Sequence, residues 1–174
     1  MGYLVSKISP DGMTIQMEAT GQALEGKAYL EAGYPALDFD AVDINGNAVS
    51  LKDFRGKLLL IDFWATWCGP CVGELPNVKK VYAAQKDKGL CILGISLDQK
   101  LDVLRGFLTN NPDMSWAQIC DEKGWQAALA QKYRVSSIPA TFLIGADGNI
   151  LARDLRGDAL EKAVEQALES PGVR

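Results

Sequence analysis

The stretch LLLIDFWATWCGPC, residues 58–71, connects a run of apolar residues to two cysteines that stand three positions apart. Its first seven residues are almost all apolar, which is typical of a strand buried on both faces of a sheet. Beyond it, apolar residues recur at helical spacing from Cys71 to about Lys86. The stretch therefore predicts a buried strand over 58–64 that leads directly into a helix, with Cys68 at the junction.

The two cysteines are placed for redox chemistry. A thiolate at Cys68 would face the free backbone N–H groups and the positive end of the helix dipole, which lower its pKa. Residues three positions apart in one helical turn have Cα atoms within disulfide range, so Cys71 can close a small ring with Cys68 and release it again. Pro70 suits this turn because its missing N–H would have no helical partner there. We expect Cys68 to exchange disulfides with a partner, Cys71 to resolve the mixed disulfide, and Trp67 to form one wall of the site.

An acid is needed to move a proton on and off Cys71, and two carboxyl groups are candidates. Asp62 lies within the apolar strand, where burial raises the pKa of a carboxyl group. Glu74 follows Cys71 by three residues and shares its face of the helix. Both remain candidates at this stage, with Asp62 slightly favoured.

Other chemistries have less support. The chain has no histidine, which excludes Cys-His and Ser-His-Asp nucleophile systems and every histidine-containing metal site. A zinc site would need Cys91 and Cys120, which stand far apart and belong to no second CxxC pair, so we expect no metal and two plain core thiols. A purely structural disulfide would close too short a loop to restrain the unfolded chain much. With no phosphate loop or dinucleotide fingerprint, we expect no dissociable cofactor.

The rest of the chain alternates predicted strands and helices, which indicates a mixed sheet covered by helices. A hairpin is expected around Asn45-Gly46, between strands over 37–44 and 48–51. The other predicted strands cover 90–97, 115–120, 140–144 and 149–152. The other predicted helices cover 101–108, 125–133 and a last segment that Asp158 caps and that runs to Leu168.

The first 32 residues differ from the remainder. Pro-Asp-Gly separates two alternating runs within them, which predicts a β-hairpin, and a Gly-rich linker follows. We therefore divide the chain into an extension or linker over 1–32, which resembles the tail of a preceding region, one domain over 33–170 and a tail over 171–174.

Charge and hydropathy exclude several classes of partner. Eighteen basic and twenty-two acidic residues give a net charge of −4, with no basic run, so nucleic acid is not an expected partner. No stretch reaches the roughly 18 apolar residues of a membrane span, and no signal peptide is visible. The chain is then either cytosolic or a trimmed piece of an exported protein. A monomer is the default at this size.

With these residues in view, the chain resembles the thioredoxin superfamily, and within it the TlpA/ResA-like thiol–disulfide oxidoreductases. The resemblance covers roughly residues 33–169 and implies a thioredoxin fold, an α/β architecture with a central mixed sheet flanked by helices. It also implies an inserted strand and helix, within DMSWAQICDEKGWQAALAQKY (113–133), before a strand that begins at a cis-proline. The motifs that carry it are GYPALDF (33–39), DFRGKLLLIDFWATWCGPC (53–71), VGELP (72–76), GISLD (94–98) and VSSIPATFLIGADGNI (135–150).

The resemblance implies a role for several residues. Cys68 matches the family's nucleophile and Cys71 its resolving cysteine. Pro139 matches the cis-proline that faces the two cysteines, and the backbone of Ile138 would then pair with an extended substrate strand. Pro76 matches a proline that kinks the active-site helix.

The same resemblance extends to the acids and to the surface around the cysteines. Asp62 matches the buried acid of ordinary thioredoxins, and Glu74 matches the acid typical of the TlpA/ResA-like branch. Together with Trp67, Ile138 and Pro139, we expect Gly69 and Pro70 to contact the substrate.

A Gly-Pro pair between the cysteines is typical of the reducing members, so the resemblance implies a protein-disulfide reductase. Its substrates would be disulfide-containing proteins, including apocytochrome c during cytochrome c maturation, and its electrons would come from an upstream protein donor. A disulfide oxidase or isomerase, a thiol peroxidase with antioxidant activity and a redox-inert binding module are the alternatives. The expected location is the periplasm or cell envelope, with the cytoplasm as the alternative.

Overall fold

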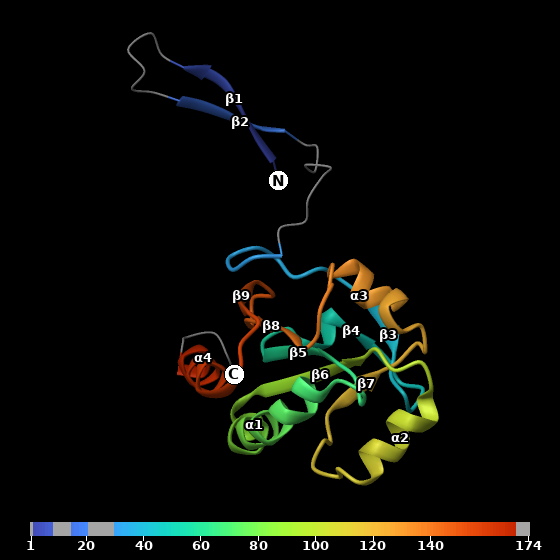
Figure 1. The fold of residues 1–174 in the computed structure, drawn as a ribbon. Coiled ribbons are helices and arrows are strands. Elements are labelled where there is room, and N and C mark those ends of the chain that lie inside the picture. The colour runs from blue at the N-terminus through green and yellow to red at the C-terminus, as the bar shows by residue number, and fades with distance from the viewer. Residues whose placement is uncertain (1, 9–14, 21–29, 170–174) are drawn as a thin grey trace.

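The computed structural model describes residues 2–8, 15–20 and 30–169. Within the last of these ranges a five-stranded sheet is flanked by helices (Figure 1). Its strands, in the order in which they lie side by side, are β7 (Ala117–Ile119), β6 (Leu90–Ser96), β5 (Leu58–Trp64), β8 (Ala140–Ile144) and β9 (Ile150–Arg153). The predicted mixed sheet of a thioredoxin-like fold is confirmed.

The strand directions decide which loops meet. Strands β5, β6 and β7 run parallel, whereas β8 is antiparallel to β5, and β9 is antiparallel to β8. The carboxyl ends of the three parallel strands therefore lie at one edge of the sheet. Because the chain leaves β5 there toward Cys68, we call this edge the Cys68 end.

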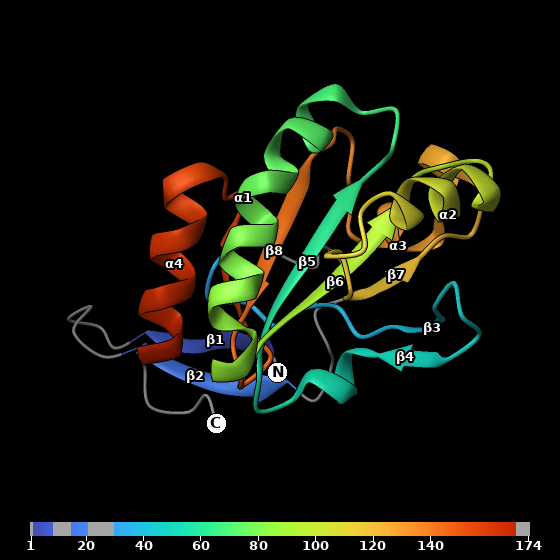
Figure 2. The same ribbon diagram turned by 90° about the horizontal axis from the view of Figure 1, so that it is seen from below.

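Helices lie on both faces of the sheet. Helices α1 (Gly69–Gln85) and α4 (Gly157–Glu169) pack side by side on one face (Figure 2). Helix α3 (Ala128–Lys132) lies over the other face, and α2 (Leu101–Thr109) follows β6 along the chain. Short 3-10 helices lie at Leu51–Phe54 (η1), Lys86–Lys88 (η2) and Gly124–Gln126 (η3). Across the described ranges, no helix combines the length and apolar character needed to cross a bilayer.

Strand β5 lies at the centre of the core, and all seven of its residues are buried. Phe63 packs against Tyr133 and Phe142 with ring centroids 5.7 and 6.0 Å away. Because successive side chains of a strand point to opposite faces, Asp62 points the other way, toward α1. The apolar run therefore predicts this strand correctly, and its single acidic residue lies on the face that carries the cysteines.

The hairpin around Asn45-Gly46 is present but shorter than predicted. Strands β3 (Asp40–Val42) and β4 (Ala48–Ser50) have three residues each. The Asp43 carboxylate accepts hydrogen bonds from the N–H groups of Asn45 and Asn47, at 2.8 and 2.9 Å. These bonds make Asp43 part of the turn, so it does not extend the strand.

The helix predicted over 125–133 is wrong in its extent, because the segment forms two short helices, η3 and α3. Ala127 separates them with an extended backbone, at φ −53° and ψ 132°. The Asp121 carboxylate accepts hydrogen bonds from the N–H groups of Lys123 (3.1 Å) and Ala128 (2.9 Å). One side chain thus satisfies donors at the start of both helices, which a helical period cannot reveal.

The predicted N-terminal hairpin is confirmed as β1 (Gly2–Ile8) paired antiparallel with β2 (Ile15–Thr20). Its Pro-Asp-Gly turn, most of the predicted linker and the predicted tail lie outside the described residues. The segment from Leu30 onward runs along β9. The Gly33 N–H donates to the Ile150 carbonyl and the Ile150 N–H to the Tyr34 carbonyl, both at 2.8 Å. The division of the chain at residue 32 stays a prediction.

Candidate active site

Cys68 stands at the N-terminus of α1. It is the N-cap residue of the helix, and its Sγ accepts a hydrogen bond from the Cys71 N–H at 3.2 Å. The two cysteines form a disulfide with Cα atoms 5.2 Å apart. Pro70 lies in the first turn, as predicted, and α1 continues through Pro76. A reduced Cys68 would thus present its thiolate to a backbone donor and to the positive end of a long helix.

Both sulfurs of the disulfide are buried, because Cys68 is 5% exposed and Cys71 is 3% exposed. The Cys68 Sγ lies 3.8 Å from the Ile138 carbonyl oxygen, so the loop before β8 covers it. The peptide bond between Ile138 and Pro139 is cis, as the resemblance implies.

The exposed surface at the disulfide comes from the neighbours of Cys68 in the chain. Trp67 is 56% exposed, and Gly69 and Pro70 are also exposed. Ile138 is half-buried and Pro139 is buried. The residues predicted to contact substrate therefore surround the disulfide, and Trp67 offers the largest exposed side chain among them.

Asp98, which follows β6, braces the loop that carries Trp67 and Cys68. Its carboxylate accepts hydrogen bonds from the Thr66 N–H at 3.1 Å and from the Thr66 hydroxyl at 2.6 Å. The Ser96 hydroxyl donates to the same carboxylate at 2.7 Å. Asp98 was not among the residues predicted for the site, although an aspartate directly after a buried strand was an available signal.

A small cavity lies beside Cys71. Its volume is about 10 Å³, which is about the smallest that can hold a water molecule. Asp62 and Glu74 both border this cavity together with Cys71. Either carboxyl group could therefore exchange a proton with the Cys71 sulfur through the cavity. The residues lining it are Asp62, Cys71, Glu74, Val78, Pro139, Thr141, Leu155 and Arg156.

Asp62 is the acid whose protonation is most altered by its surroundings. Burial raises the pKa of its carboxyl group to about 7, the negative charge of Glu74 adds to the rise, and Arg156 opposes it. A carboxyl group with a pKa near neutrality can both give and take a proton at physiological pH. This property favours Asp62 over Glu74 as the candidate proton carrier.

Glu74 accepts hydrogen bonds that stabilise the local structure. Its Oε1 accepts hydrogen bonds from the Gly157 N–H and from the Asn77 side-chain amide, both at 2.7 Å. The prediction that Asp158 caps the last helix is wrong, because α4 begins one residue earlier, at Gly157. Gly157 has a φ of +52°, a conformation that glycine adopts without strain. Glu74 thus joins α1 to the start of α4.

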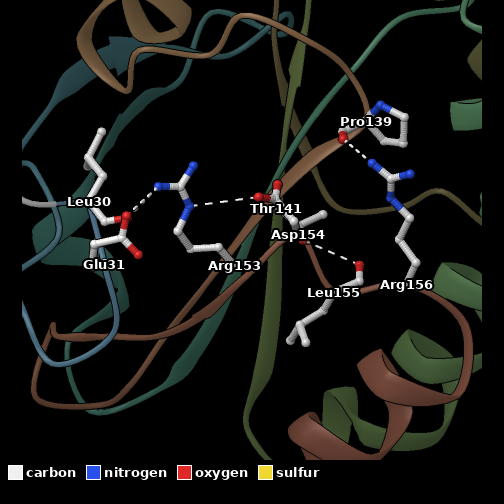
Figure 3. A network of polar contacts seen from close by, with 8 residues as sticks. All are labelled: Leu30, Glu31, Pro139, Thr141, Arg153, Asp154, Leu155 and Arg156. Atoms are coloured by element: carbon white, nitrogen blue, oxygen red, sulfur yellow. Dashed lines mark hydrogen bonds and ion pairs between the residues drawn. The ribbon is translucent and has the colours of Figure 1, made fainter.

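Arg156, which the sequence analysis did not single out, connects the cavity to the cis-proline loop. Its guanidinium donates a hydrogen bond to the Pro139 carbonyl at 2.7 Å (Figure 3). The nearby Thr141 hydroxyl donates to the Leu155 carbonyl at 3.3 Å. In the same view Arg153 reaches the Leu30 carbonyl, at 2.8 Å. The segment between β9 and α4 is therefore tied to the loop that covers Cys68.

Replacing Glu74 separates its charge from its hydrogen bonds. Glu74→Gln keeps an oxygen that can accept the Gly157 N–H but removes the negative charge, so we expect the pKa of Asp62 to fall below about 7. Glu74→Ala also removes the acceptor, and we expect it to lower the free energy of unfolding by about 1 kcal/mol more. Carboxyl NMR titration of Asp62 and chemical denaturation measure the two effects. An unchanged Asp62 titration in Glu74→Gln would contradict the electrostatic coupling.

The remaining cysteines lie apart from the disulfide. Cys91 and Cys120 are free and partly buried, and burial raises the pKa of both thiols. Among the residues that the structure describes, no group of three or more Cys, Asp or Glu side chains could hold a metal ion.

Comparison with known proteins gives consistent results. Residues 32–153 match the AhpC/TSA family. The chain is 30% identical over 140 residues to the thiol-disulfide oxidoreductase ResA of Bacillus thuringiensis subsp. konkukian, which covers 80% of this chain and 78% of ResA. It is similar to the thioredoxin domain of a thiol-disulfide oxidoreductase from Bacteroides vulgatus, with a TM-score of 0.72 and 34% identity over 79% of this chain and 98% of that one. A thiol:disulfide interchange protein from Bacteroides sp. gives a TM-score of 0.69 and 33% identity, over 80% of this chain and 91% of that one.

Proposed function

The chain belongs to the AhpC/TSA family and is a thiol–disulfide oxidoreductase, and we propose that it acts as a reductase of disulfides in partner proteins. The observation that carries the proposal is the position of the Cys68–Cys71 pair. It lies at the N-terminus of α1, next to the cis Ile138–Pro139 peptide and in front of the cavity that holds Asp62.

The proposed reaction has two exchange steps. The Cys68 thiolate attacks one sulfur of the substrate disulfide, whose other sulfur leaves as a thiolate and takes up a proton. The Cys71 thiol then loses its proton, and its sulfur attacks the Cys68 sulfur of the mixed disulfide. The second substrate sulfur leaves as a thiol, and the Cys68–Cys71 disulfide forms. The substrate gains two electrons and two protons, and a protein dithiol donor restores the reduced pair.

We assign Asp62 to the proton transfer at Cys71. The carboxyl borders the same cavity as Cys71 and is kept from water, and its pKa of about 7 suits a group that must change protonation within one cycle. Glu74 and Arg156 act on Asp62 through their charges and hold the surrounding elements in place. Both are positioning residues in this proposal.

The backbone before Pro139 supports the proposed substrate binding. Ile138 lies in the loop before β8, and within the described residues its N–H has no hydrogen-bond partner. An extended substrate segment could pair with it as an added strand while its cysteine reaches Cys68. Contacts with the substrate would then replace the contact between this loop and the Cys68 sulfur.

We further propose that the protein acts in the periplasm or cell envelope, on disulfide-containing proteins that include apocytochrome c. The support is the resemblance to the TlpA/ResA-like branch, in which such domains are often exported. A thiol peroxidase with antioxidant activity is less well supported, because Cys68 lies in a CxxC pair and forms a disulfide with Cys71. The upstream donor would be a second protein dithiol.

The midpoint potential of the Cys68–Cys71 couple tests the direction of the reaction. We expect a value near the reducing end of the range for such proteins, about −270 mV, and not near the oxidising end at about −120 mV. The protein would be equilibrated in graded thiol–disulfide buffers, its free thiols trapped and the oxidised fraction determined by mass. A value at the oxidising end would assign the protein to disulfide oxidation or isomerisation.

A further inference from the structure

Two of the four tryptophans lie on the surface and contact each other. Trp64 and Trp116 are buried in the core, at 1% and 6% exposed, whereas Trp67 and Trp125 are 56% and 41% exposed. The rings of Trp67 and Trp125 have centroids 6.3 Å apart and planes inclined at 58°. Among the described residues, this is the only aromatic pair whose two members are both large exposed side chains.

The strand directions explain why residues so far apart in sequence meet. Trp67 follows β5 and Trp125 follows β7, and both strands run parallel to β6. Their carboxyl ends lie at the same edge of the sheet, so the segments that follow them emerge together at the Cys68 end. Trp67 is also the residue directly before Cys68. The pair is therefore part of the surface that a substrate must approach to exchange a disulfide with Cys68.

Trp125 is held in place by its own segment. The Asp121 carboxylate binds the N–H groups on both sides of it, those of Lys123 and Ala128. The Gln131 side-chain amide donates to the Trp125 carbonyl at 2.7 Å. An exposed tryptophan on a braced segment can bind a partner with little loss of conformational freedom, and tryptophan is enriched among the residues that dominate binding energy.

From this geometry we propose that Trp125 and Trp67 form a docking surface for a large apolar or aromatic side chain, located beside the cysteine of an extended disulfide-containing polypeptide. This inference rests on the proposed function, since it names a feature of the polypeptides that Cys68 would reduce. Both rings present apolar faces next to the nucleophile, and neither indole has an ionic group that would demand a charged partner. Trp125 is then a specificity-determining residue that acts on substrate choice and not on the thiol chemistry.

Two synthetic peptides test the proposal. Each carries one intramolecular disulfide, and they differ only in having Phe or Ser two positions from the cysteine. The reduced protein should reduce the Phe peptide roughly five to ten times faster than the Ser peptide in single-turnover reactions. Trp125→Ala should remove most of this ratio, and Trp125→Phe should retain most of it, which separates the loss of an aromatic contact from a fold defect. Equal rates for the two peptides in the parent protein, or an equal loss for both in Trp125→Ala, would overturn the proposal.

A control variant and a second measurement distinguish a failure of the docking surface from a failure of the proposed reductase. Leu151 is also an exposed apolar residue, at 43%, but it lies on β9 near the end of the sheet opposite Cys68. Leu151→Ala should leave the peptide ratio unchanged, and a changed ratio would contradict a docking surface confined to the tryptophan pair.

The midpoint potential of the parent tests the proposed reductase separately. A reducing potential with no preference for Phe defeats only the docking surface, whereas an oxidising potential defeats the reductase on which it rests.

Discussion

Cys68→Ser should lower the rate of protein-disulfide reduction by at least about a thousandfold. The serine hydroxyl cannot form a disulfide and is not ionised at neutral pH, so the first exchange step has no nucleophile. The fold should survive, because the substitution replaces one buried atom and the N-cap preference of serine suits this position. Reduction of a disulfide-linked peptide by the pre-reduced variant measures the effect, and residual activity near that of the parent would contradict the role of Cys68.

Cys71→Ser should give a different result, which assigns the two cysteines separately. With Cys68 intact and no resolving thiol, the variant should accumulate a mixed disulfide with its substrate, detectable as a covalent adduct by mass. Cys91→Ser is the matched control, because Cys91 is a free, partly buried thiol paired with Leu59 at the opposite end of the sheet. It should react as the parent does. Adduct formation by Cys68→Ser in place of Cys71→Ser would reverse the assignment.

Asp62→Asn should make the protein more stable and less active at the same time. Burial raises the pKa of Asp62 to about 7 in the folded protein, whereas an aspartate in an unfolded chain has a pKa of about 3.9. The folded state therefore holds its proton more tightly than the unfolded state does. The resulting contribution to stability is complete below about pH 4 and is lost as the pH rises through about 7.

The size of the stability difference follows from the shift in the pKa of Asp62. A difference of about three pKa units corresponds to about 4 kcal/mol, which is the cost of an ionised Asp62 above pH 8. Asparagine carries no charge at any of these pH values, so the variant should exceed the parent in unfolding free energy by up to that amount at pH 8 and match it near pH 4. Urea denaturation across this range measures the difference. Asp87→Asn, at an exposed position, is the control for loss of one carboxylate outside the core.

The loss of activity in Asp62→Asn has its own measurement. General acid–base transfer contributes about a hundredfold or more to steps that need it, so resolution of the mixed disulfide at Cys71 should slow by roughly that factor. The parent rate should depend on pH around 7, and the variant rate should lose this dependence. A variant with the parent's pH profile would exclude Asp62 as the proton carrier and return the role to Glu74.

The central elements of the fold can be predicted from the amino-acid sequence alone. The run over 58–64 predicts β5 to the residue, because a strand covered on both faces needs apolar side chains at every position. The helix predicted from Cys71 to about Lys86 is observed as Gly69–Gln85, within two residues at each end, since apolar residues at Leu75, Val78 and Val81 mark its buried face. Cys68, Cys71 and Asp62 were also visible, since each is a residue type with special chemistry in an unusual place, whereas Pro139 was implied only by the family resemblance.

How these residues act on one another depends on contacts that form only in the folded protein. The sequence favours Asp62 only slightly over Glu74, whereas the fold buries Asp62 and makes Glu74 a hydrogen-bond acceptor for the N-terminus of α4. Arg156 and Trp125 carry no sequence pattern that connects them with Cys68, which lies more than 50 positions away. Local periodicity reports which face of an element is buried, whereas burial depth, charge coupling and shared surfaces depend on elements distant in sequence. Parallel strands that end at one edge of the sheet bring those distant elements together, and that arrangement forms the site.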